Sequence, residues 1–284
     1  MDRTEERQGL LSALPVALVL AAIFLAPLLV VALFAFMPPG SFGLAHAPTL
    51  ENFRLFFAQG YYSSLLWSLG MAAAATIVLF LVCYPLAYGM AKVFRSFTLV
   101  ITLLVVMSLF VSENIRLFGW VLTLMKGGLL SGYLKAWTGL EMDSALYSVP
   151  VIVFGLVYSY LPFMLFPLAQ GIAMVPEDVR LAASDLGASR TRILWEIDLP
   201  LAMPGIVVGS LLSFVLSAGA MAESKLLGGQ TVVVMADEIE SAFTYGQNWP
   251  LGSALAVILI LIIGLLATVA LAKVDLDGIM GRRR

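Results

Sequence analysis

A few charged residues follow long uncharged runs, where a predicted apolar helix would end. Glu113 and Arg116 follow one such run, and Glu223 follows another. Charged groups at this depth usually have a function, because their burial in a bilayer is costly. We expect a polar gate here, or alternatively an ion pair that joins two helices. The candidate pathway residues are Glu113, Arg116, Trp120, Tyr160, Ser213, Ser217 and Glu223.

Ser213 and Ser217 also belong to a series of small residues that recurs at every fourth position from Gly205. One face of the predicted helix therefore carries only small side chains, which normally allows tight helix packing. A lining for the solute pathway is the alternative.

The residue patterns of common catalytic and metal sites are absent from the sequence. None of the five lysines is preceded by the glycine that a GxxxxGK[ST] phosphate loop requires. Cys83 is the only cysteine and His46 the only histidine, so the sequence supports neither a disulfide nor a cysteine or histidine cluster for a metal. We therefore expect no catalytic residue, no metal and no cofactor in this chain.

The longest polar stretch, residues 175–206, begins with the signals of a short helix. Pro176 suits a first helical position, and Glu177 and Asp178 complement the positive end of a helix dipole. Gly187 is expected to end this helix, because glycine is the usual residue just past a helix end. The apolar and polar side chains between these points fall on opposite faces.

A second short helix is expected after the bend. Ser189 can cap it, and it should run from about Arg190 to Trp195 until Leu199 and Pro200 end it. Helices of this length are marginal alone in water, so they must pack against something. That surface could belong to this chain or to a different protein.

The composition excludes a water-soluble globule, because 61% of the 284 residues are hydrophobic and only 12% are charged. A membrane-spanning helix requires about 20 mainly apolar residues. The uncharged runs predict an all-α membrane protein with six spans in a single domain, residues 1–284. The predicted spans are residues 11–36, 64–91, 97–120, 146–172, 205–222 and 251–272.

The distribution of lysine and arginine gives the orientation. Six spans place eleven basic residues on the side of both termini and five on the other, so the first side is expected to be cytoplasmic. The polar stretch then lies inside the cell. The outer loops carry eight acidic and five basic residues. Their net negative charge would attract a cationic solute. The formal net charge of −2 argues against a nucleic-acid partner.

The polar stretch resembles the "EAA" loop of permease subunits of bacterial ATP-binding-cassette (ABC) importers. The resemblance rests on the alanine pair at 182–183, on Gly187, on Leu-Pro at 199–200 and on Pro-Gly at 204–205. Leu181 stands where the family usually has glutamate. The resemblance implies a type I importer permease fold, whose cytoplasmic coupling loop, residues 175–204, docks on a separate ATPase. The implied docking residues are Glu177, Asp178, Leu181, Ala182, Ala183, Asp185, Leu186, Gly187, Ala188, Ser189 and Arg190.

Further stretches between residues 15 and 270 resemble the spermidine/putrescine branch of these permeases, specifically the first of its two partner subunits. One departure is the sequence Glu223-Ser224-Lys225, where the family usually has Thr-Pro. The stretches are YPLAY at 84–88, IRLFGW at 115–120, GLL at 128–130, YLPFM at 160–164, LLGG at 226–229 and NWPLGSAL at 248–255.

The resemblance implies a noncatalytic pore subunit of the bacterial inner membrane, multi-pass with cytoplasmic termini. Its implied partners are two ABC ATPase subunits that bind ATP and magnesium, a second and different permease subunit, and a periplasmic or lipid-anchored solute-binding protein. The solute would be a polyamine or a related small organic ion.

Two other classes remain as alternatives from the residues alone. A stand-alone secondary transporter of small amines would need coupling-ion residues at mid-membrane, and the middle of each predicted span lacks Asp, Glu, Lys and Arg. A membrane enzyme would need a motif such as GxSxG, which the sequence lacks.

Overall fold

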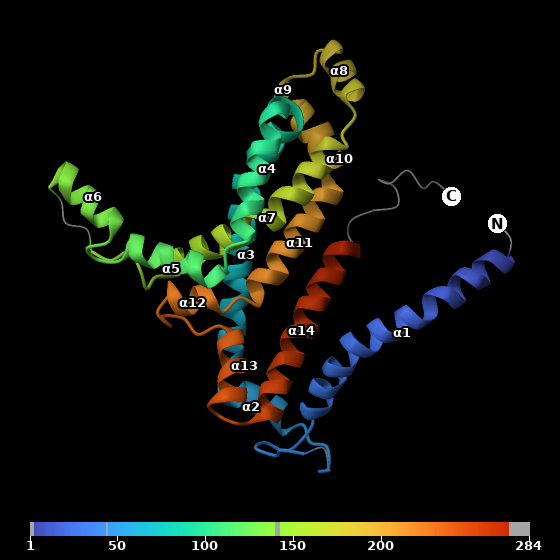
Figure 1. Ribbon diagram of the computed structural model, residues 1–284, viewed down its shortest axis with the longest axis vertical. Coiled ribbons are helices and arrows are strands. Elements are labelled where there is room, and N and C mark those ends of the chain that lie inside the picture. Colours follow the sequence, from blue (N-terminus) through green and yellow to red (C-terminus); the bar gives the residue numbers. More distant parts are fainter. Residues whose placement is uncertain (1–2, 44, 140–142, 273–284) are drawn as a thin grey trace. The chain divides into compact units, whose positions relative to one another are not determined.

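The computed structural model describes residues 3–43, 45–139 and 143–272, and every regular element in these ranges is a helix. The prediction of an all-α chain is confirmed. The chain divides into two compact units, which are described separately (Figure 1). Unit 1 comprises residues 1–62 and 236–261, and unit 2 comprises residues 63–235 and 262–284. The prediction that residues 1–284 form a single membrane domain stays a prediction.

Unit 1 is held together by a buried asparagine and by aromatic contacts. Asn52 is fully buried, and its Nδ2 donates hydrogen bonds to the carbonyls of Ala35, at 3.0 Å, and Met37, at 2.7 Å. The rings of Phe34 and Trp249 lie 6.2 Å apart. Its helices are α1 (Arg3–Phe34), α2 (Glu51–Ala58), α13 (Met235–Thr244) from residue 236 on, and α14 (Trp249–Ala272) up to residue 261.

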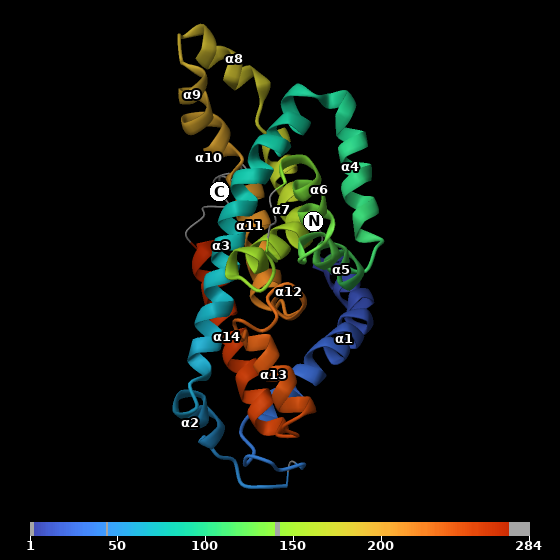
Figure 2. The ribbon, with the colours of Figure 1, turned by 90° about the vertical axis from the view of Figure 1, so that its left-hand side faces the viewer.

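Unit 2 contains the polar stretch and every candidate pathway residue. Its longest helices, α3 and α7, run beside α11, while α8 lies beyond one end of them and α12 near the other (Figures 1 and 2). The elements are α3 (Tyr61–Tyr88) from residue 63 on, the π-helical η1 (Gly89–Val93), α4 (Arg95–Leu109), α5 (Glu113–Leu124), α6 (Leu129–Thr138), α7 (Val149–Ala173), α8 (Glu177–Asp185), α9 (Arg190–Ile193), the π-helical η2 (Leu194–Asp198), α10 (Leu199–Leu201), α11 (Met203–Ala218), α12 (Ala222–Leu226) and the end of α14.

The core of unit 2 forms where α7 and α11 approach closely through glycines. A Cβ atom added to Gly205 would lie 2.4 Å from the carbonyl oxygen of Pro167 and 2.7 Å from the Cα of Gly171. Gly209 would similarly meet the carbonyl oxygen of Met164 at 3.0 Å. The tight-packing interpretation of the small-residue series is thus confirmed at these two glycines. Ser213 and Ser217 continue the same buried face.

Gly205→Ala is expected to lower the free energy of unfolding by about 1–3 kcal/mol, because the new methyl group would overlap backbone atoms that cannot rotate away. Thermal unfolding of the detergent-solubilised protein measures the change. Gly70→Ala in α3 is the control, since its Cβ would have no neighbour within 4 Å. Equal melting temperatures for the two variants would contradict this account of the α7–α11 contact.

The prediction that residues 97–120 form a single span is wrong. The helix α4 ends at Leu109, and α5 begins anew at Glu113. Ser112 has an extended backbone (ψ 138°), which interrupts the helix, and the carboxylate of Glu113 in the first turn of α5 suits a helix start. Glu113 therefore begins a helix and does not lie inside a continuous one.

The predicted ends of two other elements are also wrong. The fifth span, predicted as 205–222, is α11 and ends at Ala218, so Glu223 lies in the separate helix α12. The second short helix does not stop at Leu199 and Pro200 but continues through η2 and α10. Pro200 lies directly after the π-helical η2, within this continuous helical stretch.

Among the described residues, five helices are long and apolar enough to cross a membrane, or six if one bent pair counts as a single span. That pair is Arg190–Leu201 and Met203–Ala218, which meet at 68°. The predicted cytoplasmic termini fall on residues 1–2 and 273–284, outside the described ranges.

Candidate coupling site

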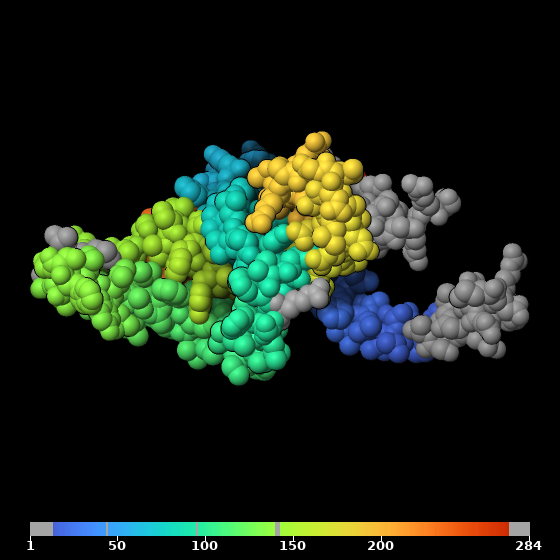
Figure 3. All heavy atoms as spheres, turned by 90° about the horizontal axis from the view of Figure 1, so that it is seen from above, coloured from blue at the N-terminus to red at the C-terminus, as the bar shows by residue number. Residues whose placement is uncertain are grey.

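The helix α8 projects from one end of unit 2 and has no buried residue (Figures 1 and 3). Glu177 and Asp178 lie in its first turn, as the sequence predicts, but Pro176 is the N-cap and not the first helical residue. In the view of Figure 3, α8 and α9 (yellow) stand out beside the segment that joins α3 to α4. A helix of nine residues that is this exposed gains little from packing against its own chain.

Gly187 makes the bend between the two short helices. Its φ angle is +83°, in the left-handed region that residues with a Cβ rarely adopt. The amide of Gly187 donates to the carbonyl of Ser184 at 2.9 Å, and the amide of Ala188 donates to the carbonyl of Ala183 at 3.0 Å. These bonds satisfy carbonyls at the end of α8 and fix the direction in which the chain leaves it.

Ser189 caps the second helix, as predicted. Its Oγ accepts a hydrogen bond from the backbone N–H of Arg192 at 3.3 Å. One turn later, the Nε of Arg192 and a carboxylate oxygen of Glu196 form an ion pair at 2.9 Å. Both side chains of that pair are exposed, so it adds at most a few tenths of a kcal/mol, about 0.3–0.5.

A buried ion pair ties α8 to the rest of unit 2. The Nε of Arg180 lies 3.0 Å from Oδ1 of Asp198 in η2, and the two side chains are only 20% and 3% exposed. Arg180 also donates a hydrogen bond to the hydroxyl of Tyr88, and its guanidinium lies 5.5 Å from the centre of that ring. One arginine thus joins α8 both to η2 and to the end of α3.

A second tether joins the segment before α8 to η1. Lys92 Nζ donates a hydrogen bond to the backbone carbonyl of Val175 at 2.6 Å. Burial raises the pKa of the Asp198 carboxyl above its ordinary value, while Arg180 and Lys92 act in the opposite direction. Asp198 therefore depends on these two cations to remain an acceptor.

Removing Arg180 alone is expected to cost about 3–5 kcal/mol, because Arg180→Met would leave the Asp198 carboxylate buried without its ion-pair partner. The double variant Arg180→Met/Asp198→Leu should recover most of this loss, since replacing both partners by apolar groups is often nearly neutral. Thermal unfolding of the wild type, both single variants and the double variant measures the coupling. Additive losses in the double variant would contradict a direct interaction.

The exposed side of the bend is unusually apolar. Leu186 is 89% exposed and Leu181 is 56% exposed, in a segment where water-facing side chains would ordinarily be polar. Next to Leu186 is a cavity of about 280 Å³ between the two short helices. It is lined by Ala183, Leu186, Gly187, Ala188, Arg192, Ile193, Glu196 and Ile197.

The predicted docking residues lie on α8, at the bend and at the start of α9. Four of them line the cavity: Ala183, Leu186, Gly187 and Ala188. The others are exposed on α8 or at the start of α9: Glu177, Asp178, Leu181, Ala182, Asp185, Ser189 and Arg190. The sequence argument missed Arg180, Asp198, Tyr88 and Lys92 as the residues that hold this surface in place.

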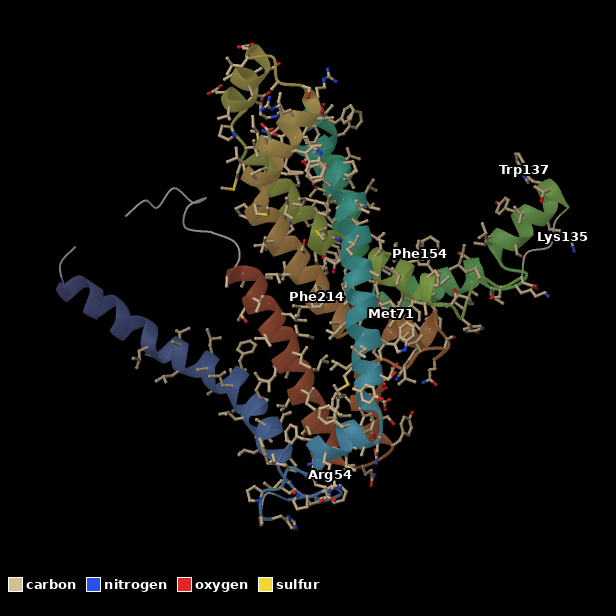
Figure 4. The ribbon with its side chains drawn as sticks, turned by 180° about the vertical axis from the view of Figure 1, so that it is seen from behind. Arg54, Met71, Lys135, Trp137, Phe154 and Phe214 are labelled. Carbon is tan, nitrogen blue, oxygen red and sulfur yellow. The ribbon has the colours of Figure 1, made fainter. Side chains whose placement is uncertain are left out.

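The candidate pathway residues all lie in unit 2: Ser213 and Ser217 on α11, and the others on α5, α7 and α12. The hydroxyl of Tyr160 donates to Oε1 of Glu113 at 3.4 Å, and the guanidinium of Arg116 lies 5.6 Å from the centre of the Tyr158 ring. The centroid of the Trp120 ring lies 5.5 Å from the centroid of the Tyr158 ring. The centroid of the Phe154 ring, labelled in Figure 4, lies 4.6 Å from that of Trp120.

Glu223 is buried, and its helix α12 contacts both α5 and α7. The structure thus brings Glu113, Arg116, Trp120 and Tyr160 together. Ser213 and Ser217 are buried on α11, on the face whose glycines meet α7. By contrast, Lys135 and Trp137 project from α6, away from this group (Figure 4).

Comparisons with known proteins agree with this architecture. Spermidine/putrescine permease PotB of Haemophilus influenzae is 34% identical over 248 residues, which cover 84% of each chain. PotB of Escherichia coli is 32% identical over 224 residues, which cover 78% of this chain and 81% of that protein. The inner membrane ABC transporter permease YdcU of Escherichia coli is 29% identical over 236 residues, covering 76% of this chain and 73% of that protein.

The fold is similar to that of a chain in a bacterial ABC transporter that imports the acidic polysaccharide alginate. The TM-score is 0.75, with 18% identity, over 94% of this chain and 96% of that chain. At this identity the likeness shows the type I importer permease fold and not the solute. Residues 84–275 match the family model described as binding-protein-dependent transport system inner membrane component. The chain therefore belongs to this family, as a noncatalytic, multi-pass inner-membrane permease subunit of an ABC importer.

Proposed function

We propose that this chain forms part of the transmembrane pathway of a polyamine importer and that α8 and α9 are its docking surface for an ATPase subunit. The observation that carries the docking proposal is an exposed apolar surface on a segment that is itself anchored by a buried ion pair. An unanchored loop would absorb a push from a partner, whereas an anchored one transmits it. Residues 1–284 would act as one permease domain, with 175–204 as its coupling loop.

The proposed motion starts at α8. When the ATPase subunits close on ATP, α8 would move as a rigid body. Arg180 would carry that motion to Asp198 in η2, and Lys92 would connect the start of the segment to η1. Because η1 continues α3, and η2 leads through α10 into α11, two helices of the core would tilt together and change access to the pathway.

The remaining partners follow from the family context. Two ATPase subunits would supply ATP and magnesium, a second and different permease would complete the pathway, and an external binding protein would deliver the solute. The excess of lysine and arginine on the side of residues 175–204 supports a cytoplasmic position for α8 and for both termini. The family assignment favours this importer over a stand-alone secondary transporter.

The spermidine/putrescine permeases among the relatives support a polyamine as the solute. Uptake of radiolabelled spermidine and putrescine into proteoliposomes tests the proposal, with the complete importer, its binding protein and ATP inside. We expect uptake that requires ATP and all partners. Uptake by this chain alone, or ATP-dependent uptake of neither amine, would contradict it.

A further inference from the structure

Glu223 is an acidic residue that lies buried in unit 2. It is 1% exposed, and neither of its carboxylate oxygens has a hydrogen-bond partner in the described part of the chain. A carboxylate in such surroundings is very unfavourable unless a proton or a cation accompanies it. The coupling site makes no use of this residue, so its burial needs a separate explanation.

The surrounding helices make room for Glu223. A Cβ atom on Gly155 of α7 would lie 3.1 Å from Cγ of Glu223 and 2.5 Å from the side chain of Leu227, so a larger residue there would crowd both side chains. One turn further along α7, Ser159 is 3% exposed and its hydroxyl also lacks a partner among the described residues. Two unsatisfied polar groups thus occur at the contact between α7 and α12.

A second carboxylate lies beside this contact. Glu113 begins α5, which contacts α12, and it accepts the hydrogen bond from Tyr160, the residue after Ser159. Glu113 and Tyr160 are half-buried, so they form a more open rim above the buried Glu223.

The charges of this group do not cancel. Glu113 and Glu223 bring two negative charges, and Arg116, stacked near Tyr158, brings one positive charge. The group therefore has room for one further positive charge. The rings of Trp120 and Tyr158 at the rim suit an organic cation, which aromatic faces attract.

We propose that Glu223 and Glu113 form a binding site for one protonated amino group of the transported solute, with Ser159, Tyr160 and Trp120 as its surroundings. This inference rests on the proposed function, because it takes the solute to be an amine. The ammonium group would donate hydrogen bonds to both carboxylates and to the free acceptor of Ser159. Gly155 would be the residue that keeps the floor of the site open.

The test is equilibrium binding of radiolabelled putrescine to the complete permease–ATPase complex, purified without the external binding protein. The isosteric change Glu223→Gln keeps the shape of the side chain and removes its charge. We expect the dissociation constant to rise about tenfold to hundredfold, the usual range for a hydrogen bond to a charged group. The exposed carboxylate of Asp143, which pairs with Lys126, provides the control Asp143→Asn, with unchanged binding expected.

The nature of the ligand is tested by competition. Butane-1,4-diol has the length of putrescine but no ammonium group, and it should not displace the label from the wild-type complex. Displacement by the diol would overturn the assignment of a cation site. Should Glu223→Gln fail to assemble, Glu113→Gln at the half-buried rim serves as the second variant and is expected to weaken binding in the same range.

Two outcomes would overturn the inference. Unchanged putrescine affinity in Glu223→Gln, with a raised melting temperature, would mean that the carboxyl merely holds a proton. Absence of binding to a wild-type complex that still imports putrescine with its binding protein would overturn the site but leave the proposed function intact. If the wild type neither binds nor imports polyamines, the proposed function itself falls, and the inference falls with it.

Discussion

Gly187→Val is expected to abolish ATP-driven uptake by the assembled importer while the chain still inserts into the membrane. The φ angle of +83° at this position is strongly unfavourable for a β-branched residue, at a cost of about 1–3 kcal/mol. An added Cβ would meet nothing within 4 Å, so the backbone and not a clash is the cause. The bend would relax, and α8 and α9 would no longer present one surface.

Uptake in proteoliposomes and the amount of inserted protein are measured together. Gly139→Val is the matched control, because Gly139 follows α6 with a φ angle of +72° and similarly open surroundings. Gly187→Asn should retain much of the uptake, since asparagine tolerates left-handed angles better than valine. Normal transport by Gly187→Val would count against the docking proposal.

Leu186→Glu is expected to weaken the binding of the ATPase subunit by at least about a hundredfold, the effect of losing a central contact residue in an interface. The side chain is 89% exposed, so the change leaves the fold of the chain intact. In the proposed complex, the new carboxylate would replace an apolar group at the contact, and the cost of its desolvation would not be compensated.

Co-purification and a titration of the purified ATPase measure this loss. Leu50→Glu is the control, because Leu50 is also an exposed leucine, at 67%, and lies in unit 1, outside the coupling loop. Equal ATPase affinity of Leu186→Glu and the wild type would show that the apolar bend is not the contact surface.

The two short helices were predictable because their signals are local. Pro176, Gly187 and Ser189 each act on the backbone within a few residues. Gly187 and Ser189 have the expected roles, whereas Pro176 is the N-cap of α8 and not its first helical residue. The anchoring pair of Arg180 and Asp198 was not predictable, because its residues belong to different helices and only the fold brings them together. Helical periodicity places Arg180 on the polar face of α8 but says nothing of its partner.

The break in the third predicted span shows a limit of hydropathy. Residues 97–112 contain no charge, and the change of backbone direction at Ser112 needs no proline or glycine to mark it. Hydropathy also fails to predict the burial of Glu223. The sequence places Glu223 just after an apolar helix, but the side chain packs against Gly155, which lies far away in the sequence and has no side chain of its own. Packing between helices, and not composition, decides both features.

The tether from Lys92 ends on the main-chain oxygen of Val175 and not on a side chain. Every residue type carries that oxygen, so mutation at position 175 cannot delete the acceptor. Under the docking proposal, the residues after Val175 can therefore change to fit another ATPase subunit without losing this hydrogen bond. Chimeras that exchange residues 176–190 between related importers should keep the hydrogen bond between Lys92 of η1 and Val175. They should bind the ATPase subunit of the importer that donates the segment.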